Sequence, residues 1–148
     1  NMQKIVIDTN IIVSALISRD GSYSREVIEK VFDDSITPLM GEALFNEYTE
    51  VTNRHYIFKS CVLKEKERLE FLQAYMKCCL WCKIYYKWRP NLQDEGDNHI
   101  IELAVAGGAN YIITKNIKDL KSGELLFEKL QIVTPDEFIK EKLWQQSQ

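Results

Sequence analysis

The chain has 148 residues, 45% of them hydrophobic and 28% charged, which is typical of a soluble globular protein with one domain and a substantial buried core. Its net charge of -3 excludes a general positive field that would attract a nucleic acid, so a polyanion has to be bound by a local basic patch or through a metal ion. No apolar run reaches the length of a membrane span, and the N-terminus lacks the pattern of a signal peptide. We therefore expect a cytoplasmic protein that makes no membrane contact.

A short buried strand followed by a helix is the first predicted unit, and Asp8 lies between them. Residues 5–7 form a β-branched run that is too uniformly apolar for a strand with one exposed face, which favours a buried parallel strand. Residues 10–16 follow in a helical pattern, with Asn10 as the predicted N-cap. Asp8 is thus expected at the carboxyl end of a strand, where open α/β sheets bind their ligands. The alternative is that Asp8 only organises the turn.

Helices and strands alternate along the rest of the chain. Helical patterns cover 25–32, 41–53, 64–80, 97–106, 125–130 and the segment from 135, and strand patterns cover 35–39, 81–88, 111–114 and 131–133. The predicted N-caps are Ser24, Asp97 and Thr134. This order predicts an α/β fold, a three-layer α/β/α sandwich with a central, mainly parallel sheet of four to five strands. Because Asn1 is interpreted as a remnant of an expression tag, the single predicted domain spans residues 2–148.

The cysteines do not form a recognisable metal site. Cys78, Cys79 and Cys82 lie in an aromatic, apolar context, and neither they nor Cys61 has a second paired cluster at zinc-site spacing. We expect reduced, mostly buried thiols, with a redox pair as the alternative.

Acidic residues from three segments are expected to converge at one edge of the sheet. Asp8 follows the first strand, and Glu47 lies beside the buried stripe of the helix at 41–53. Asp97 starts a later helix, beneath a loop that also carries Asp94. Right-handed crossovers bring the carboxyl ends of parallel strands to the same edge. Clustered carboxylates stay ionised only with a compensating cation, and a set without His or Cys favours Mg²⁺ or Mn²⁺.

Taken in order, these segments resemble the PIN domain, a fold of metal-dependent ribonucleases that includes many toxin components of bacterial toxin-antitoxin pairs. The resemblance rests on IDTNIIVSAL at 7–16, LFNEYTEV at 44–51 followed by Arg54, DEGDN at 94–98, and ELAVAGGANYIIT at 102–114. The segment TPDEF at 134–138 also resembles the branch of the family described as toxins. The resemblance implies an endoribonuclease that uses Mg²⁺ or Mn²⁺, an RNA substrate, a cognate antitoxin as partner and a homodimer.

Carried over position by position, Asp8, Glu47 and Asp97 match the metal-binding acids of the family. The family usually has an Asp or Asn two residues after the Thr that follows the fourth strand, and here this residue is Asn116. An amide can bind a metal but adds no negative charge, and Asp119, three residues later, is the alternative donor. The supporting residues that the resemblance implies are Thr9, Asn10, Asp94, Thr114 and Asp119. The departure at Asn116 leaves one alternative open, a PIN fold with a weakened metal site that binds RNA or protein without cleavage.

Other polar residues near the predicted site have two interpretations. Lys115, Lys118 and Arg89 are candidates for binding RNA phosphates, although scattered basic residues more often form solvated surface. His99 lies in the first turn of a helix, and we interpret it as an exposed or loop-packed histidine rather than a metal ligand. The predicted inward face of that helix consists of Ile100, Ile101, Ala104 and Val105.

Overall fold

A computed structural model describes residues 3–18, 22–84, 98–117, 120 and 130–145. The strands are β1 (Gln3–Ile7), β2 (Ile36–Met40), β3 (Leu80–Trp81), β4 (Tyr111–Ile113) and β5 (Gln131–Val133). The α-helices are α1 (Thr9–Ile17), α2 (Tyr23–Phe32), α3 (Glu42–Thr52), α4 (Glu65–Cys78), α5 (Asn98–Gly107) and α7 (Pro135–Lys140). The short 3-10 helices η1 (His55–Phe58) and η3 (Leu143–Gln145) complete the described elements.

The strands form one parallel sheet in the order β3-β2-β1-β4-β5. β1 lies at the centre, where Ile5 is opposite both Pro38 of β2 and Tyr111 of β4. Residues 5–7 are completely buried. A strand that pairs on both edges and is covered on both faces has no polar side, which explains the uninterrupted apolar run. The predicted buried parallel strand is therefore confirmed.

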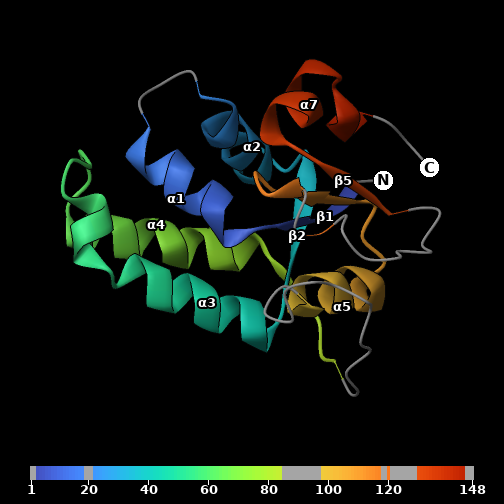
Figure 1. Cartoon of the computed structure of the whole chain (residues 1–148), viewed down its shortest axis with the longest axis horizontal. Helices are drawn as coiled ribbons and strands as arrows, with labels where there is room; N and C mark the ends of the chain where they lie inside the picture. The colour runs from blue at the N-terminus through green and yellow to red at the C-terminus, as the bar shows by residue number, and fades with distance from the viewer. Residues whose placement is uncertain (1–2, 19–21, 85–97, 118–119, 121–129, 146–148) are drawn as a thin grey trace.

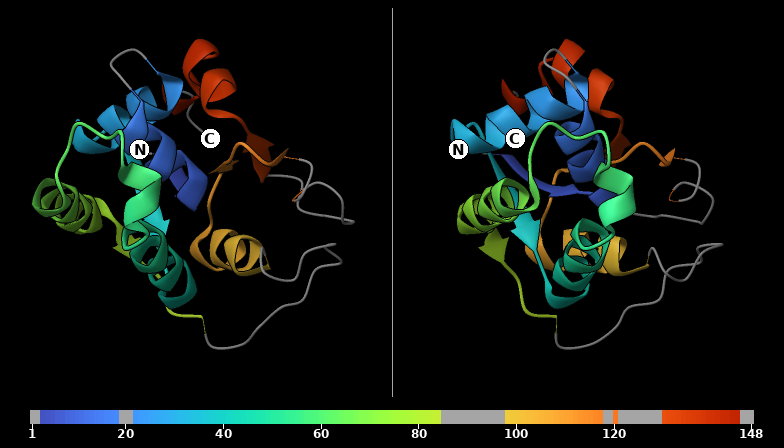
Figure 2. Two further views of the ribbon diagram at one scale, coloured as in Figure 1. Left: turned by 60° about the vertical axis from the view of Figure 1, so that its left-hand side comes forward. Right: turned by 90° about the vertical axis from the view of Figure 1, so that its left-hand side faces the viewer.

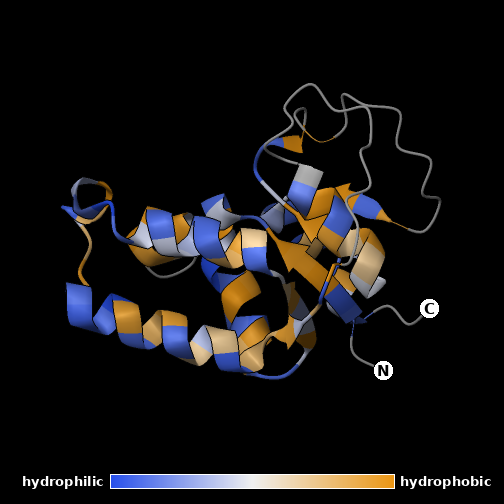
Figure 3. Ribbon diagram, turned by 90° about the horizontal axis from the view of Figure 1, so that it is seen from below, coloured by the Kyte–Doolittle hydropathy of each residue, from blue (hydrophilic) through white to orange (hydrophobic). Residues whose placement is uncertain are grey.

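Helices cover both faces of the sheet, and this confirms the predicted three-layer α/β/α architecture. Figure 1 shows α1, α2 and α7 above the sheet and α3, α4 and α5 below it, and the views in Figure 2 show the same separation. In Figure 3 the strands are mostly hydrophobic, whereas α3 and α4 alternate between hydrophobic and hydrophilic turns. This alternation is expected for helices with one face toward the sheet and the other toward solvent. Among the described residues, no helix combines the length and hydrophobicity that a membrane span requires.

The first helix starts one residue earlier than predicted. α1 begins at Thr9, so Asp8 occupies the N-cap position without a side-chain capping bond, and the predicted cap at Asn10 is wrong. The side chain of Asn10 instead donates to the carboxylate of Asp8. An Asn at the second position of a helix can reach back to the preceding turn, and here that bond supports Asp8 rather than the helix end.

Of the other predicted caps, one is correct and one is shifted. Ser22 rather than Ser24 is the N-cap of α2, where its hydroxyl accepts from the backbone N–H of Arg25 at 3.1 Å, whereas Ser24 is buried. Thr134 caps α7 as predicted, accepting from the backbone N–H of Glu137 at 3.3 Å. The predicted cap Asp97 lies outside the described residues.

Two more predictions need correction. The strand predicted at 81–88 is the short β3, because residues 82–84 continue without strand pairing and 85–88 lie outside the described residues. In α5 the predicted inward face is wrong at Val105, which is 42% exposed, while Leu103 is buried instead. Most of the helix predicted at 125–130 also lies outside the described residues.

All the cysteines carry free thiols, as predicted, but they are only partly buried. The Cys79 thiol donates to the carbonyl oxygen of Tyr75 at 3.3 Å, and burial raises the pKa of Cys79 to about 12. Such a thiol is almost entirely protonated near neutral pH and is a poor nucleophile. These properties do not support the alternative of a redox pair at Cys79.

Tyr48 connects α3 to the end of the central strand. Its side chain is completely buried, and its ring packs against Tyr75 of α4 with 5.9 Å between the ring centroids. Its hydroxyl donates to the carbonyl oxygen of Ile7 at 2.5 Å. Because Ile7 is the last residue of β1 and Tyr48 follows Glu47, this bond positions the middle of α3 against the residue that precedes Asp8.

We predict that Tyr48→Phe lowers the free energy of unfolding by about 1–2 kcal/mol, because it removes a buried hydrogen bond without changing the ring. Urea denaturation followed by circular dichroism measures this loss. Tyr56→Phe is the matched control, since Tyr56 is 71% exposed and its substitution should change stability by less than about 0.5 kcal/mol. Equal losses in the two variants would contradict the role of the Tyr48 hydroxyl.

Candidate functional site

The strand order creates a topological switch point between β1 and β4. From β1 the chain moves outward to β2 and β3, whereas β4 and β5 lie on the other side of β1. Open α/β sheets bind ligands at such a point, outside the carboxyl ends of the strands. Asp8 directly follows β1 and Thr114 directly follows β4, so both residues lie at this position.

Asp8 is held at the switch point through its backbone and its side chain. Its backbone N–H donates to the carbonyl oxygen of Ile113 at 3.0 Å. Its Oδ2 accepts from the hydroxyl of Thr114 at 2.7 Å and from the Asn10 amide at 3.3 Å. Burial raises the pKa of Asp8, the Thr114 hydrogen bond opposes this effect, and the negative charge of Glu47 raises the pKa further. The ionised form of Asp8 is therefore disfavoured by its surroundings.

The turn after β4 is connected to the same carboxylate. Thr114 Oγ1 accepts from the backbone N–H of Asn116 at 3.0 Å while it donates to Asp8. Asn10 Oδ1 accepts from the backbone N–H of Lys115 at 3.4 Å. The structure thus brings Thr114 and Asn10 into contact with Asp8, and it brings Asn116 near through its backbone, while the Asn116 side chain is exposed.

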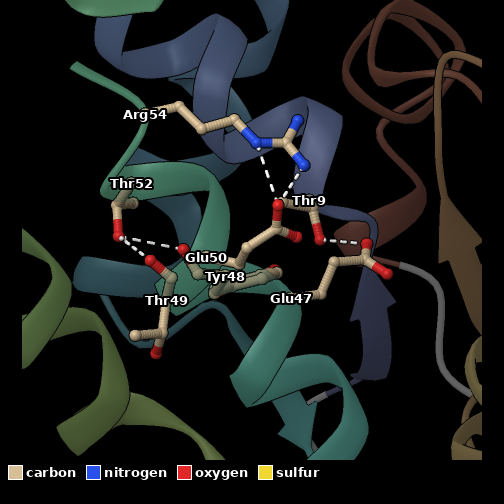
Figure 4. A network of polar contacts seen from close by, with 7 residues as sticks. All are labelled: Thr9, Glu47, Tyr48, Thr49, Glu50, Thr52 and Arg54. Carbon is tan, nitrogen blue, oxygen red and sulfur yellow. Dashed lines mark hydrogen bonds and ion pairs between the residues drawn. The ribbon is translucent and has the colours of Figure 1, made fainter.

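Glu47 reaches the site from α3 and has a hydrogen-bond partner at each carboxylate oxygen. Its Oε1 accepts from the hydroxyl of Thr9 at 2.5 Å, and its Oε2 lies 2.8 Å from Nε2 of His99. Partial burial raises the pKa of Glu47, but the hydrogen bonds from His99 and Thr9 together outweigh it, so the pKa lies below its usual value. Figure 4 shows Glu47 beside Thr9, whereas Glu50 is bonded to Arg54. Glu47 thus faces the residues around Asp8, whereas Glu50 is paired with an exposed arginine.

The interpretation of His99 as an exposed residue is wrong, and the loop that precedes it lies outside the described residues. Its side chain is only 18% exposed and contacts Glu47. The sequence does contain a signal for this placement, because His99 and Leu103 are four residues apart and share one helical face, and Leu103 is buried. The predicted inward face contained Val105 instead of Leu103, so it did not indicate that His99 lies on the buried side of α5.

Several predicted site residues cannot be placed. Arg89, Asp94, Asp97, Lys118 and Asp119 lie outside the described residues. Within the described part of the chain, no three His, Cys, Asp or Glu side chains are grouped closely enough to hold a metal ion. Lys115 is described, and its ammonium group donates to the hydroxyl of Ser14 on α1 at 2.6 Å.

Comparison with known families identifies the fold that carries this site. Residues 4–118 match the PIN domain. The chain belongs to the PIN domain family. This chain is similar in structure to the crystal structure of VapBC2 from Rickettsia felis bound to a DNA fragment from its promoter. The TM-score is 0.60 and the sequence identity is 16%, and the match covers 89% of this chain and 98% of that chain. No curated protein sequence matches this PIN domain.

The donors at the switch point fit a hard divalent cation. PIN domains are generally nucleases that use divalent metal ions. Asp8 and Glu47 offer carboxylate oxygens, and Asn116 follows in the adjoining turn with an amide oxygen, which are the ligand types that Mg²⁺ and Mn²⁺ prefer. Burial disfavours the ionised form of Asp8, and a cation bound beside it would favour that form.

We predict that Asp8→Asn stabilises the metal-free protein at pH 7. Because the folded-state pKa of Asp8 lies above the ordinary value of 3.8, the contribution of Asp8 to stability is complete below that value and is lost as the pH rises through the folded-state pKa. Asparagine carries no charge to desolvate. Urea midpoints in EDTA buffer should therefore be higher for the variant than for the parent at pH 7, with a difference that shrinks as the pH falls. A variant that is less stable than the parent at pH 7 would contradict this assignment.

Proposed function

We propose that this PIN domain is a metal-dependent ribonuclease and the toxin component of a toxin-antitoxin pair. The observation that supports the proposal best is the approach of Asp8 and Glu47 at the switch point, from a strand end and from a helix. The negative charge of Glu47 raises the pKa of Asp8. A divalent cation bound by both carboxylates would compensate this repulsion, which gives a physical reason for the arrangement.

Asp8, Glu47 and Asp97 are the proposed ligands of Mg²⁺ or Mn²⁺, with the amide oxygen of Asn116 as a further donor. The bound ion would supply the positive charge that stabilises a phosphodiester group during in-line attack by water. Asn116 leaves the donor set with one negative charge fewer than a fourth acid would give. We propose that Asp119 or Asp94 makes up part of this difference from nearby.

The chain's own hydrogen bonds define how the two described acids are presented. Thr114 and Asn10 both donate to Oδ2 of Asp8 and thereby fix the orientation of its carboxylate. Thr9 donates to Oε1 of Glu47. Fixed donors of this kind reduce the reorganisation that is needed when an ion and a substrate bind.

Phosphate binding is assigned to the basic residues Lys115, Lys118 and Arg89. The overall charge of -3 does not attract RNA, so contacts with the phosphate backbone must be local. The ammonium group of Lys115 is bonded to Ser14 of α1, the helix that begins directly after Asp8 and contains Asn10. Among the described residues Ser14 is the partner of this ammonium group, and a phosphate oxygen could take the place of its hydroxyl.

We predict that Asp8→Asn and Glu47→Gln each reduce RNA cleavage by at least about 100-fold, since even the outer partners of metal ligands cost about 10–100-fold when removed. Cleavage of an end-labelled, mixed-sequence RNA with Mg²⁺ or Mn²⁺ measures the rates. Glu50→Gln is the matched control on the same helix, because Glu50 is paired with exposed Arg54 instead of facing the site. Glu50→Gln should retain the parental rate. Parental rates in Asp8→Asn or Glu47→Gln would contradict the proposal.

Calorimetric titration with Mn²⁺ tests the metal site apart from cleavage. We predict micromolar binding by the parent and its loss in Asp97→Ala, because removal of one carboxylate from a small acidic set removes both a ligand and a charge. Measurable binding without RNA cleavage would instead support the alternative of a binding module with an inactive site. No binding by the parent would contradict the metal-dependent nuclease.

The toxin assignment predicts an effect on growth. Induced expression of the parent in a bacterial host should arrest growth, whereas Asp8→Asn at equal expression should not, because the effect requires the active site. The similarity to VapBC2, a complex bound to promoter DNA, supports the proposal of a second, DNA-binding partner protein. Co-expression of a small DNA-binding protein encoded beside this chain should restore growth. Arrest that persists in Asp8→Asn would contradict a nuclease toxin.

A further inference from the structure

His99 forms a direct link between two helices at the site. Its Nε2 lies 2.8 Å from Oε2 of Glu47, so the first turn of α5 is bonded to the middle of α3. The side chains of His99 and Glu47 are only 18% and 33% exposed. Such a contact is better shielded from solvent than a surface ion pair and can fix the geometry of both partners.

The two carboxylate oxygens of Glu47 are bonded to side chains from two different helices. Thr9, on the first turn of α1, donates to Oε1, and His99, on α5, is bonded to Oε2. The Asp8 carboxylate differs, because the bonds from Thr114 and Asn10 both go to Oδ2. A glutamate side chain has several rotatable bonds, and two separate contacts restrict it far more than one does. Removal of His99 would free one end of this carboxylate.

The direction of the hydrogen bond follows from the groups involved. An ionised carboxylate has no hydrogen to donate, so Nε2 of His99 must carry the hydrogen and donate it to Glu47. The other ring nitrogen, Nδ1, is buried and has no hydrogen-bond partner among the described residues. Among the described residues, the side-chain bond that His99 makes is therefore the one to Glu47.

We propose that His99 is a positioning residue that acts through Glu47. The proposal rests on the proposed function, because it assigns a task within that site. α5 begins at Asn98, directly after the predicted metal ligand Asp97 in the sequence. The bond from His99 therefore joins α3, which carries Glu47, to α5, which directly follows Asp97 in the sequence. With it in place, the Glu47 carboxylate keeps one orientation before the ion arrives.

The test compares His99→Leu, which removes the donor, with His99→Gln, whose amide N–H can donate at a similar reach. His99→Leu should weaken Mn²⁺ binding by about 10-fold and lower kcat by about 10–100-fold, while KM for RNA changes little. His99→Gln should restore most of both quantities. The protein contains only two histidines, so His55→Leu is the matched control, and its exposed side chain predicts parental values. In a Glu47→Gln background, His99→Leu should have no further effect on Mn²⁺ affinity.

A spectroscopic measurement separates this proposal from the nuclease assignment. In metal-free parent, long-range ¹H–¹⁵N spectra of the two histidines should show hydrogen on Nε2 of His99, and Glu47→Gln should shift the His99 resonances but not those of His55. An absent shift, or parental Mn²⁺ affinity in His99→Leu, would overturn the positioning role. If the parent does not cleave RNA but Glu47→Gln still shifts the His99 resonances, only the nuclease proposal is overturned.

Discussion

Burial of the Asp8 carboxylate close to Glu47 is the constraint around which the end of β1 is arranged. Burial and the charge of Glu47 both raise the pKa of Asp8, so the folded chain has to offset an unfavourable interaction. Among the described residues, it does so with hydrogen-bond donors to the two carboxylates. Thr114 donates to Asp8, while Thr9 and His99 bind Glu47. Donors of this kind stabilise the ionised form of the carboxylates that they contact.

The two segments that carry Asp8 and Glu47 are also joined by a hydrogen bond between neighbouring residues. Ile7 and Asp8 are consecutive residues, as are Glu47 and Tyr48, and the buried hydroxyl of Tyr48 donates to the carbonyl of Ile7. The side chains that repel each other are therefore attached to backbone segments that are bonded to each other. Tyr48 in turn packs against Tyr75, so the support extends through α3 to α4. Rigid elements of this kind hold functional groups more precisely than loops do.

Local signals in the sequence were sufficient for most of the fold but not for the details of the site. The apolar run at 5–7 and the Thr134-Pro135 helix start predicted β1 and α7 because burial and capping depend on neighbouring residues. Ser22 and Ser24 are equally good caps by residue type, and only the burial of Ser24 distinguishes them. The contact between His99 and Glu47 joins positions 52 residues apart, which no helical or strand period contains. The sequence motifs named Glu47 but not the histidine that holds it.

The bond between Thr114 and Asp8 joins residues 106 positions apart, and β4 is the last neighbour that the central strand receives. A ribosome makes the chain from its N-terminus, so Asp8 leaves the exit tunnel when the turn after β4 has not yet been translated. During that interval β1 can pair only with the strands that follow it directly. The hydrogen bond that orients the Asp8 carboxylate can therefore form only after β4 and the turn that follows it have been made.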